Sequence, residues 1–333
     1  RGAFTLTEPR RIHVLKRGDL EKPGAEAFPG ALAAIGGLPG RFVLSKPMDE
    51  GARRAALADW IADARNPLTW RSVVNRVWHY HFGRGLCDTP GDLGRMGGVP
   101  SHPELLDWLA AWFRDDAKGS LKALHRLIVT STTYRQSSAH DPVSAAIDPG
   151  NRLLWRMNRP RLDADTIRDS ILAVSGRLDL RMGGPSIPYF KTRPGAQLTP
   201  ILDYSGFDWD SPGASRRSIY RLVWRGIADP FLDALDFPDL SLVTPVRSFS
   251  VSALQSLALF NNEFVLHHSR RFAGYAENSA HALQDRVRLV FRQAVQRDPS
   301  AGELSDCMEA AEQAGLAAVC RAIFNSNEFL FVD

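Results

Sequence analysis

The 333-residue sequence contains only three cysteines, Cys87, Cys307 and Cys320. An odd number at such wide spacing is not a disulfide framework. A bridge between Cys307 and Cys320 would join two C-terminal helices, but buried free thiols are the simpler expectation. No Cys-x-x-Cys-His sequence occurs, so this chain is expected to carry no covalently attached c-type haem.

Long apolar runs are also missing. None approaches the roughly 20 residues that cross a bilayer as a helix, so no membrane span is predicted. The sequence begins at Arg1 rather than Met and soon enters a strand-like phrase, Ile12–Leu15. This start is typical of the interior of a longer protein, with any export signal lying upstream.

Strong positive charge is absent. The net charge is +4, and only six of the 41 basic Lys and Arg residues are lysines. The arginines are spread along the chain among acidic residues, whereas nucleic-acid binders usually concentrate them in a stripe or patch. We therefore expect no nucleic-acid partner, and we expect the arginines to pair mainly with carboxylates.

Three catalytic signatures are missing as well: the Gly-x-Ser-x-Gly nucleophile elbow, the phosphate-binding loop and the dinucleotide fingerprint. The sequence therefore names no nucleophile and no nucleotide cofactor.

Helix signals dominate what is present. Asp49, Asn66, Ser120 and Asp163 each precede an apolar periodic segment, as helix-capping residues do. Two capping boxes are predicted, at Ser101–Glu104 and Ser300–Glu303. The fold class is mainly α: a multi-helix globular domain with a few short strands and a long Pro/Gly-rich loop. The expected divisions are an extended N-terminal arm at 1–48, a helical subdomain at 49–176, the long loop at 177–215, and a second helical subdomain at 216–333.

Several phrases occur together, in order, along nearly the whole chain. They are Ile12–Asp19, Asn75–Gly85, Ser101–Ala110, Leu121–Ser137, Asn151–Asp169, Gln255–Val265 and Ile323–Val332. With them the sequence resembles the planctomycete C-terminal domain of unknown function known as the PSD-one domain. The resemblance implies an exported protein of the periplasm or cell envelope and upstream domains in the same polypeptide, among them a c-type cytochrome domain. It implies no reaction.

The densest group of reactive side chains follows Asn75. Candidate catalytic residues are His79, His81, Asp88, Asp92 and His102, and candidate metal ligands are His79, His81 and His102. His79 and His81 do not share a helix face, so a metal ion would need His102 or an acid from the following loop. The structural alternative places one histidine in the core, with Arg76 and Arg84 fixing the glycine-rich loop.

A second charged group surrounds Arg161, Asp165 and Arg168. Arg161 and Asp165 lie four residues apart, as do paired side chains on a helix. These residues are predicted either to hold a helix to the core through a buried Arg–Asp network or to bind an anion or a sugar. In the long loop, Tyr204 and Trp209 with the flanking acids Asp208 and Asp210 could bind a sugar ring or could anchor the loop.

Three functions remain open. The first is a structural or interaction module of a large exported envelope protein, with a glycan as a further partner. The second is a metal-assisted or acid/base hydrolase acting on an exported polysaccharide, through the candidate catalytic residues and Arg76. The third is non-covalent haem or metal binding in electron transfer.

Overall fold

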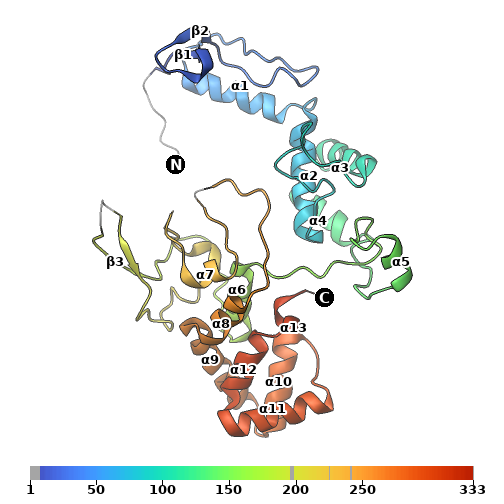
Figure 1. Ribbon diagram of the computed structural model, residues 1–333, viewed down its shortest axis with the longest axis vertical. Helices are drawn as coiled ribbons and strands as arrows, with labels where there is room; N and C mark the ends of the chain where they lie inside the picture. The colour runs from blue at the N-terminus through green and yellow to red at the C-terminus, as the bar shows by residue number, and fades with distance from the viewer. Residues whose placement is uncertain (1–7, 196–198, 225, 241, 333) are drawn as a thin grey trace. The chain divides into compact units, whose positions relative to one another are not determined.

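The computed structural model describes residues 8–195, 199–224, 226–240 and 242–332 (Figure 1). Within them the chain is mainly helical, as predicted, with two small two-stranded sheets. The chain divides into two compact units between Met157 and Asn158, which are described separately. The sequence-based division placed 158–176 with the first helical subdomain, whereas the helix in this segment packs into the core of the second unit.

The first unit begins with a hairpin, followed by α1–α5. Strand β1 (Ile12–Leu15) pairs antiparallel with β2 (Pro23–Ala27), so the predicted N-terminal arm contains one more strand than expected. Residues 1–7 of that arm lie outside the described residues. The helices are α1 (Glu50–Ala62), α2 (Pro67–Phe82), α3 (Pro103–Asp115), α4 (Leu121–Val129) and α5 (Pro142–Ile147).

The core of the first unit lies between α2, α3 and α4. Its largest apolar side chains include Trp78, Phe82 and Phe113. Asp49, Asn66 and Ser120 cap α1, α2 and α4 with their side chains, as the sequence predicts. Gly83 ends α2 in the left-handed region at φ 73°, which glycine adopts without steric cost.

The predicted capping box at Ser101 is wrong. Helix α3 begins one residue later, with His102 at the N-cap and Pro103 at the first helical position. The hydroxyl and the backbone N–H of Ser101 both donate to the carbonyl oxygen of Leu86, at 3.3 and 2.8 Å. The tertiary contact of Ser101 with Leu86, in the loop after α2, therefore replaces the local cap.

The second unit consists of α6 (Ala164–Val174), a hairpin, and a C-terminal group of helices (orange to red in Figure 1). Strands β3 (Lys191–Arg193) and β4 (Ile201–Asp203) pair antiparallel, so the expected loop at 177–215 is divided by a hairpin. The helices that follow are α7 (Pro230–Ala234), α8 (Ala253–Asn261), α9 (Glu263–Ser279), α10 (Leu283–Val295), α11 (Ala301–Ala314), α12 (Leu316–Phe324) and α13 (Asn327–Leu330).

Helices α9 and α12 pack along each other, and α6, α10 and α11 complete the core. The capping box at Ser300 and Glu303 is formed as predicted. Asn262 and Asn325 stand at helix ends, and Phe264 and Phe329 near them are buried. The core of this unit is therefore the scaffold on which its remaining loops are held.

Candidate functional site

The loop after α2 is held by a buried side chain of the helix itself. Asn75 is fully buried; its Nδ2 donates to the carbonyl of Cys87 at 2.8 Å, and its Oδ1 accepts from the N–H of Cys87 at 2.9 Å. A Cβ atom on Gly85 would lie 2.8 Å from Oδ1 of Asn75, so glycine is required at this close approach. Asn75 is therefore a structural residue rather than a reactive one.

His81 pairs with a histidine that sequence reasoning missed. Its Nε2 lies 2.7 Å from Nδ1 of His125 on α4, and its ring meets the edge of Tyr134. Partial burial, and then the charge of His125, lower the pKa of His81 below its ordinary value. His81 and His125 lie 44 positions apart in the sequence. The only local sequence signal for the pair is that His125 falls on the polar side of an amphipathic helix.

The other candidates of the first unit have separate partners. Nδ1 of His102 lies 2.9 Å from the hydroxyl of Ser101, and Arg84 forms an ion pair with Asp88 at 2.8 Å. Asp92 accepts from the backbone of Gly94 in a tight turn. His79 is half-buried with its ring against Tyr80, and Arg76 is exposed.

These side chains do not form a common centre. Among the described residues, no three His, Cys, Asp or Glu side chains gather in a group that could hold a metal ion. The metal site expected at His79, His81 and His102 stays a prediction, and the structure gives His81 and His102 different neighbours.

In the second unit, Arg168 organises the loops around α6. Its side chain is 1% exposed and donates to Asp169, to the hydroxyls of Ser218 and Tyr189, and to the carbonyls of Ala214 and Arg216, at 2.9–3.2 Å. Burial lowers the pKa of the guanidinium, yet five acceptors around it compensate for the lost water. The buried network predicted at this position is present.

The partners within that network differ from those predicted. Arg161 contacts Asp236 at 3.4 Å and the carbonyl of Ser250 at 2.8 Å, whereas Asp165 forms an ion pair with Arg247 at 2.5 Å. Arg161 precedes the first turn of α6, so the expected helical pair between Arg161 and Asp165 does not form. Residues more than 70 positions away supply the opposite charges instead.

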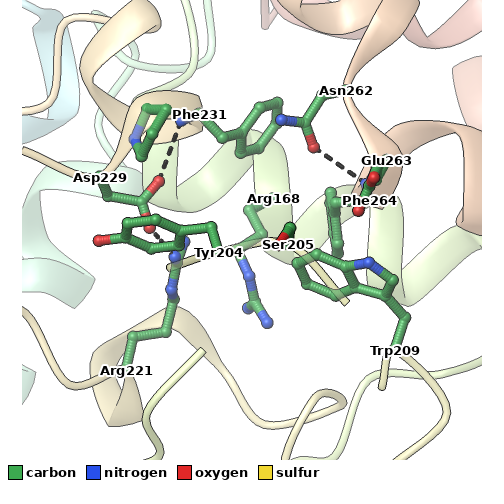
Figure 2. A pocket seen from close by; sticks show the side chains of 11 residues that line it. Arg168, Tyr204, Ser205, Trp209, Arg221, Asp229, Phe231, Asn262, Glu263 and Phe264 are labelled. Atoms are coloured by element: carbon green, nitrogen blue, oxygen red, sulfur yellow. Dashed lines mark hydrogen bonds and ion pairs between the residues drawn. The ribbon is translucent and has the colours of Figure 1, made fainter. Parts of the chain in front are cut away.

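Arg168 also borders a cleft of about 240 Å³, in which aromatic and charged side chains come together (Figure 2). We name it the aromatic cleft. It is lined by Arg168, Tyr204, Ser205, Trp209, Arg221, Asp229, Pro230, Phe231, Asn262, Glu263 and Phe264.

One ion pair, between Arg221 and Asp229, forms a wall of the aromatic cleft (Figure 2). Both side chains are at least nine-tenths buried. Oδ1 of Asp229 also accepts from the backbone N–H groups of Phe231 and Leu232, each at 3.0 Å, and thereby caps α7. The carboxylate is thus held by the fold on both of its oxygens.

Aromatic rings form the remaining walls. Trp209 meets Phe264 edge-on at 5.4 Å between ring centres, and Phe231 lies 5.6 Å from Phe264. Tyr204 packs against Phe190 at 5.4 Å. Burial, and then the charge of Asp229, raise the pKa of Tyr204 to about 12, so its hydroxyl keeps its proton. Trp209 packs on Phe264 and thus anchors the loop, and it also lines the cleft. Sugar binding by this loop stays a prediction.

Several polar groups of the aromatic cleft have no partner among the described residues. Nε of Arg221 and Nε1 of Trp209 are shielded from solvent and meet no acceptor. Glu263, at the first position of α9, is exposed and forms no ion pair. Sequence reasoning found Arg168, Tyr204 and Trp209 but missed Arg221, Asp229 and Glu263; the phrase Asp229-Pro230, typical of a helix start, was the available signal.

Comparisons with known proteins do not assign a reaction to this chain. The model of one protein family, described as "Protein of unknown function (DUF1553)", matches residues 53–311. No curated protein matches the sequence, and no solved structure matches the fold. Within the described ranges, no helix combines the length and apolar character that crossing a membrane requires.

Proposed function

The chain belongs to the DUF1553 family of proteins of unknown function, and from this premise we propose that it is a non-catalytic binding module of a larger exported protein. The aromatic cleft is the proposed binding site. It combines apolar walls with a few convergent polar groups, as small-molecule sites generally do.

The observation that carries this proposal is that both carboxylate oxygens of Asp229 already have partners in the fold. A general acid or base must exchange its proton with the bound substrate. Both oxygens of Asp229 are instead taken by Arg221 and by the first turn of α7. Glu263 is the only other carboxylate among the described residues that line the cleft, and acid/base glycoside hydrolysis ordinarily needs two. The site is therefore suited to hold a ligand without converting it.

Among the described residues of the first unit, most of the candidate catalytic side chains have separate partners. Arg84 neutralises Asp88, Asp92 closes a turn, and His81 and His102 have different partners. The hydrolase hypothesis would require at least two of these groups to face one substrate, and nothing in the described geometry favours it.

A mixed ligand panel tests binding and catalysis together. Methyl glucoside, methyl galactoside, glucuronate and benzoate are each mixed with the protein and followed by saturation-transfer NMR, with a later spectrum to detect products. We expect at least one compound to bind unchanged and to lose its signal in Tyr204→Leu. Tyr275→Leu is the matched control, because Tyr275 is exposed on α9 and does not line the cleft.

Two outcomes would overturn the proposal. One is the appearance of a new product in the presence of the protein. The other is a panel in which no compound responds to Tyr204→Leu, since the cleft would then not be the binding site.

The larger protein is a separate part of the proposal and is supported by the resemblance of the quoted phrases. We propose upstream domains in the same polypeptide, including a c-type cytochrome domain, and a place in the periplasm or cell envelope. An antibody against this chain should detect, in the envelope fraction of the source cells, a haem-staining band larger than 36.9 kDa. A band confined to the cytoplasm, or one without haem stain, would contradict this part.

A further inference from the structure

We propose that the ligand of the aromatic cleft is a single uncharged sugar ring, such as a terminal or branching residue of a glycan. This inference rests on the proposed function and adds the chemical class of the ligand. Size gives the first argument. The cleft has a volume of about 240 Å³, below the roughly 300–1,000 Å³ of sites for drug-sized ligands, which suits a single ring.

The walls give the second argument. The rings of Tyr204 and Trp209, in the loop after β4, and of Phe231, on α7, line this space (Figure 2). The face of an aromatic ring carries partial negative charge and attracts the slightly positive C–H groups of a ligand. A sugar ring presents such C–H groups on its flat faces and hydroxyl groups along its edge. It can therefore use the aromatic walls and the polar groups at the same time.

Charge balance gives the third argument. Two cations, Arg168 and Arg221, line the cleft together with two anions, Asp229 and Glu263. An anionic ligand would have to compete with Asp229 for Arg221 and would meet the unpaired charge of Glu263. Like charges that approach closely in a partly buried site repel each other. The cleft therefore disfavours uronates and sulfated sugars relative to neutral ones.

Hydrogen-bonding capacity gives the fourth argument. The two shielded N–H groups, on Arg221 and Trp209, meet no acceptor among the described residues, and the exposed carboxylate of Glu263 can accept a hydrogen bond from a ligand. A hydroxyl group can both donate and accept. An apolar ligand would leave both N–H groups without an acceptor, and a ligand with acceptors only would make no hydrogen bond to Glu263. A polyhydroxylated neutral ring fits both requirements.

Calorimetric titration of the whole chain tests this assignment. Methyl glucoside, methyl galactoside and glucuronate are titrated at about 20 mM and about 300 mM NaCl, a range over which exposed charges become screened. We expect a neutral glycoside to bind with an affinity that salt leaves unchanged, and glucuronate to bind at least about tenfold more weakly. Glu263→Gln should weaken the neutral glycoside about three- to tenfold, because the hydrogen bond to a charged acceptor is replaced by one to a neutral acceptor, and should strengthen glucuronate.

Glu277→Gln is the matched control, since Glu277 is exposed on the same helix outside the cleft, and it should change neither affinity. If glucuronate binds more tightly than the neutral glycosides and salt weakens it, the assignment of a neutral ligand is wrong while the binding function stands. If no compound binds in a manner sensitive to Tyr204→Leu, both the assignment and the proposed function fail.

Discussion

Nη2 of Arg168 donates a hydrogen bond of 2.9 Å to the hydroxyl of Tyr189, and both side chains are almost completely buried. This contact joins α6 to the segment before β3. The same guanidinium donates to the carbonyl oxygens of Ala214 and Arg216 and to the hydroxyl of Ser218. One side chain thereby fixes both sides of the loop region from which the aromatic cleft is built.

Replacing this guanidinium should cost much of the stability of the second unit. We expect Arg168→Leu to lower the free energy of unfolding by about 3–5 kcal/mol, because it removes the donor from the buried carbonyls of Ala214 and Arg216 and the opposite charge from beside Asp169. Urea unfolding followed by circular dichroism measures the change. The control is Arg181→Ala, which removes a 76% exposed partner of Asp179 and should cost less than about 1 kcal/mol. Equal effects of the two substitutions would contradict the role given to Arg168.

Asn75 should be as important in the first unit. Asn75→Ala removes both hydrogen bonds to the backbone of Cys87, and each buried group left unpaired costs about 1–3 kcal/mol. Arg76→Ala, at the exposed neighbouring position, should stay within about 0.5 kcal/mol of the unchanged chain. Thermal unfolding of the two variants compares them directly. An Asn75→Ala chain as stable as the control would show that the loop does not depend on this side chain.

Acid should destabilise the second unit through His268. Burial, and then the neighbouring charge of His267, lower the pKa of His268 from 6.5 to about 3, and Arg168, Arg177 and Asp210 also act on it. The folded chain thus binds this proton at lower pH than the unfolded chain. The contribution to stability is complete above about pH 6.5 and is lost progressively as the pH falls toward 3.

Unfolding at pH 7, 6 and 5 measures this dependence. Over that range the wild type should lose about 1–2 kcal/mol through His268, and His268→Gln should remove that slope whatever its own stability. His281→Gln, at an exposed site, should keep the slope. The pH range stays above the titration of the paired carboxylates, such as Glu303 with its pKa of about 2. An unchanged slope in His268→Gln would show that another group titrates.

Metal content distinguishes the remaining hypotheses for the first unit. Because His81 faces His125 while His102 faces Ser101, and no third ligand joins either pair among the described residues, we expect less than stoichiometric transition metal in protein purified without chelator. Mass spectrometry of metal content is the measurement. One equivalent of metal that His81→Gln or His102→Gln releases would establish the predicted metal site and revive the hydrolase hypothesis.

Local chemistry in the sequence determined where many of the helices begin and end. Asp49, Asn66, Ser120 and Ser300 cap helices as predicted. A cap is a hydrogen bond between residues two or three positions apart, so a sequence pattern can contain all of it. Ser101 differs, because its hydroxyl donates instead to Leu86, 15 positions away. Asp163 stands at the N-cap of α6 but forms no side-chain cap hydrogen bond.

Only the tertiary structure decided which charged and aromatic groups meet. The predicted pair of Arg161 and Asp165 gave way to Asp236 and Arg247, and His81 found His125. The aromatic cleft joins Arg168 on α6 to Tyr204, Arg221 and Glu263, which lie 36 to 95 positions further along the chain. Such contacts depend on how helices and loops pack around the core, and no periodicity within a single segment records that arrangement.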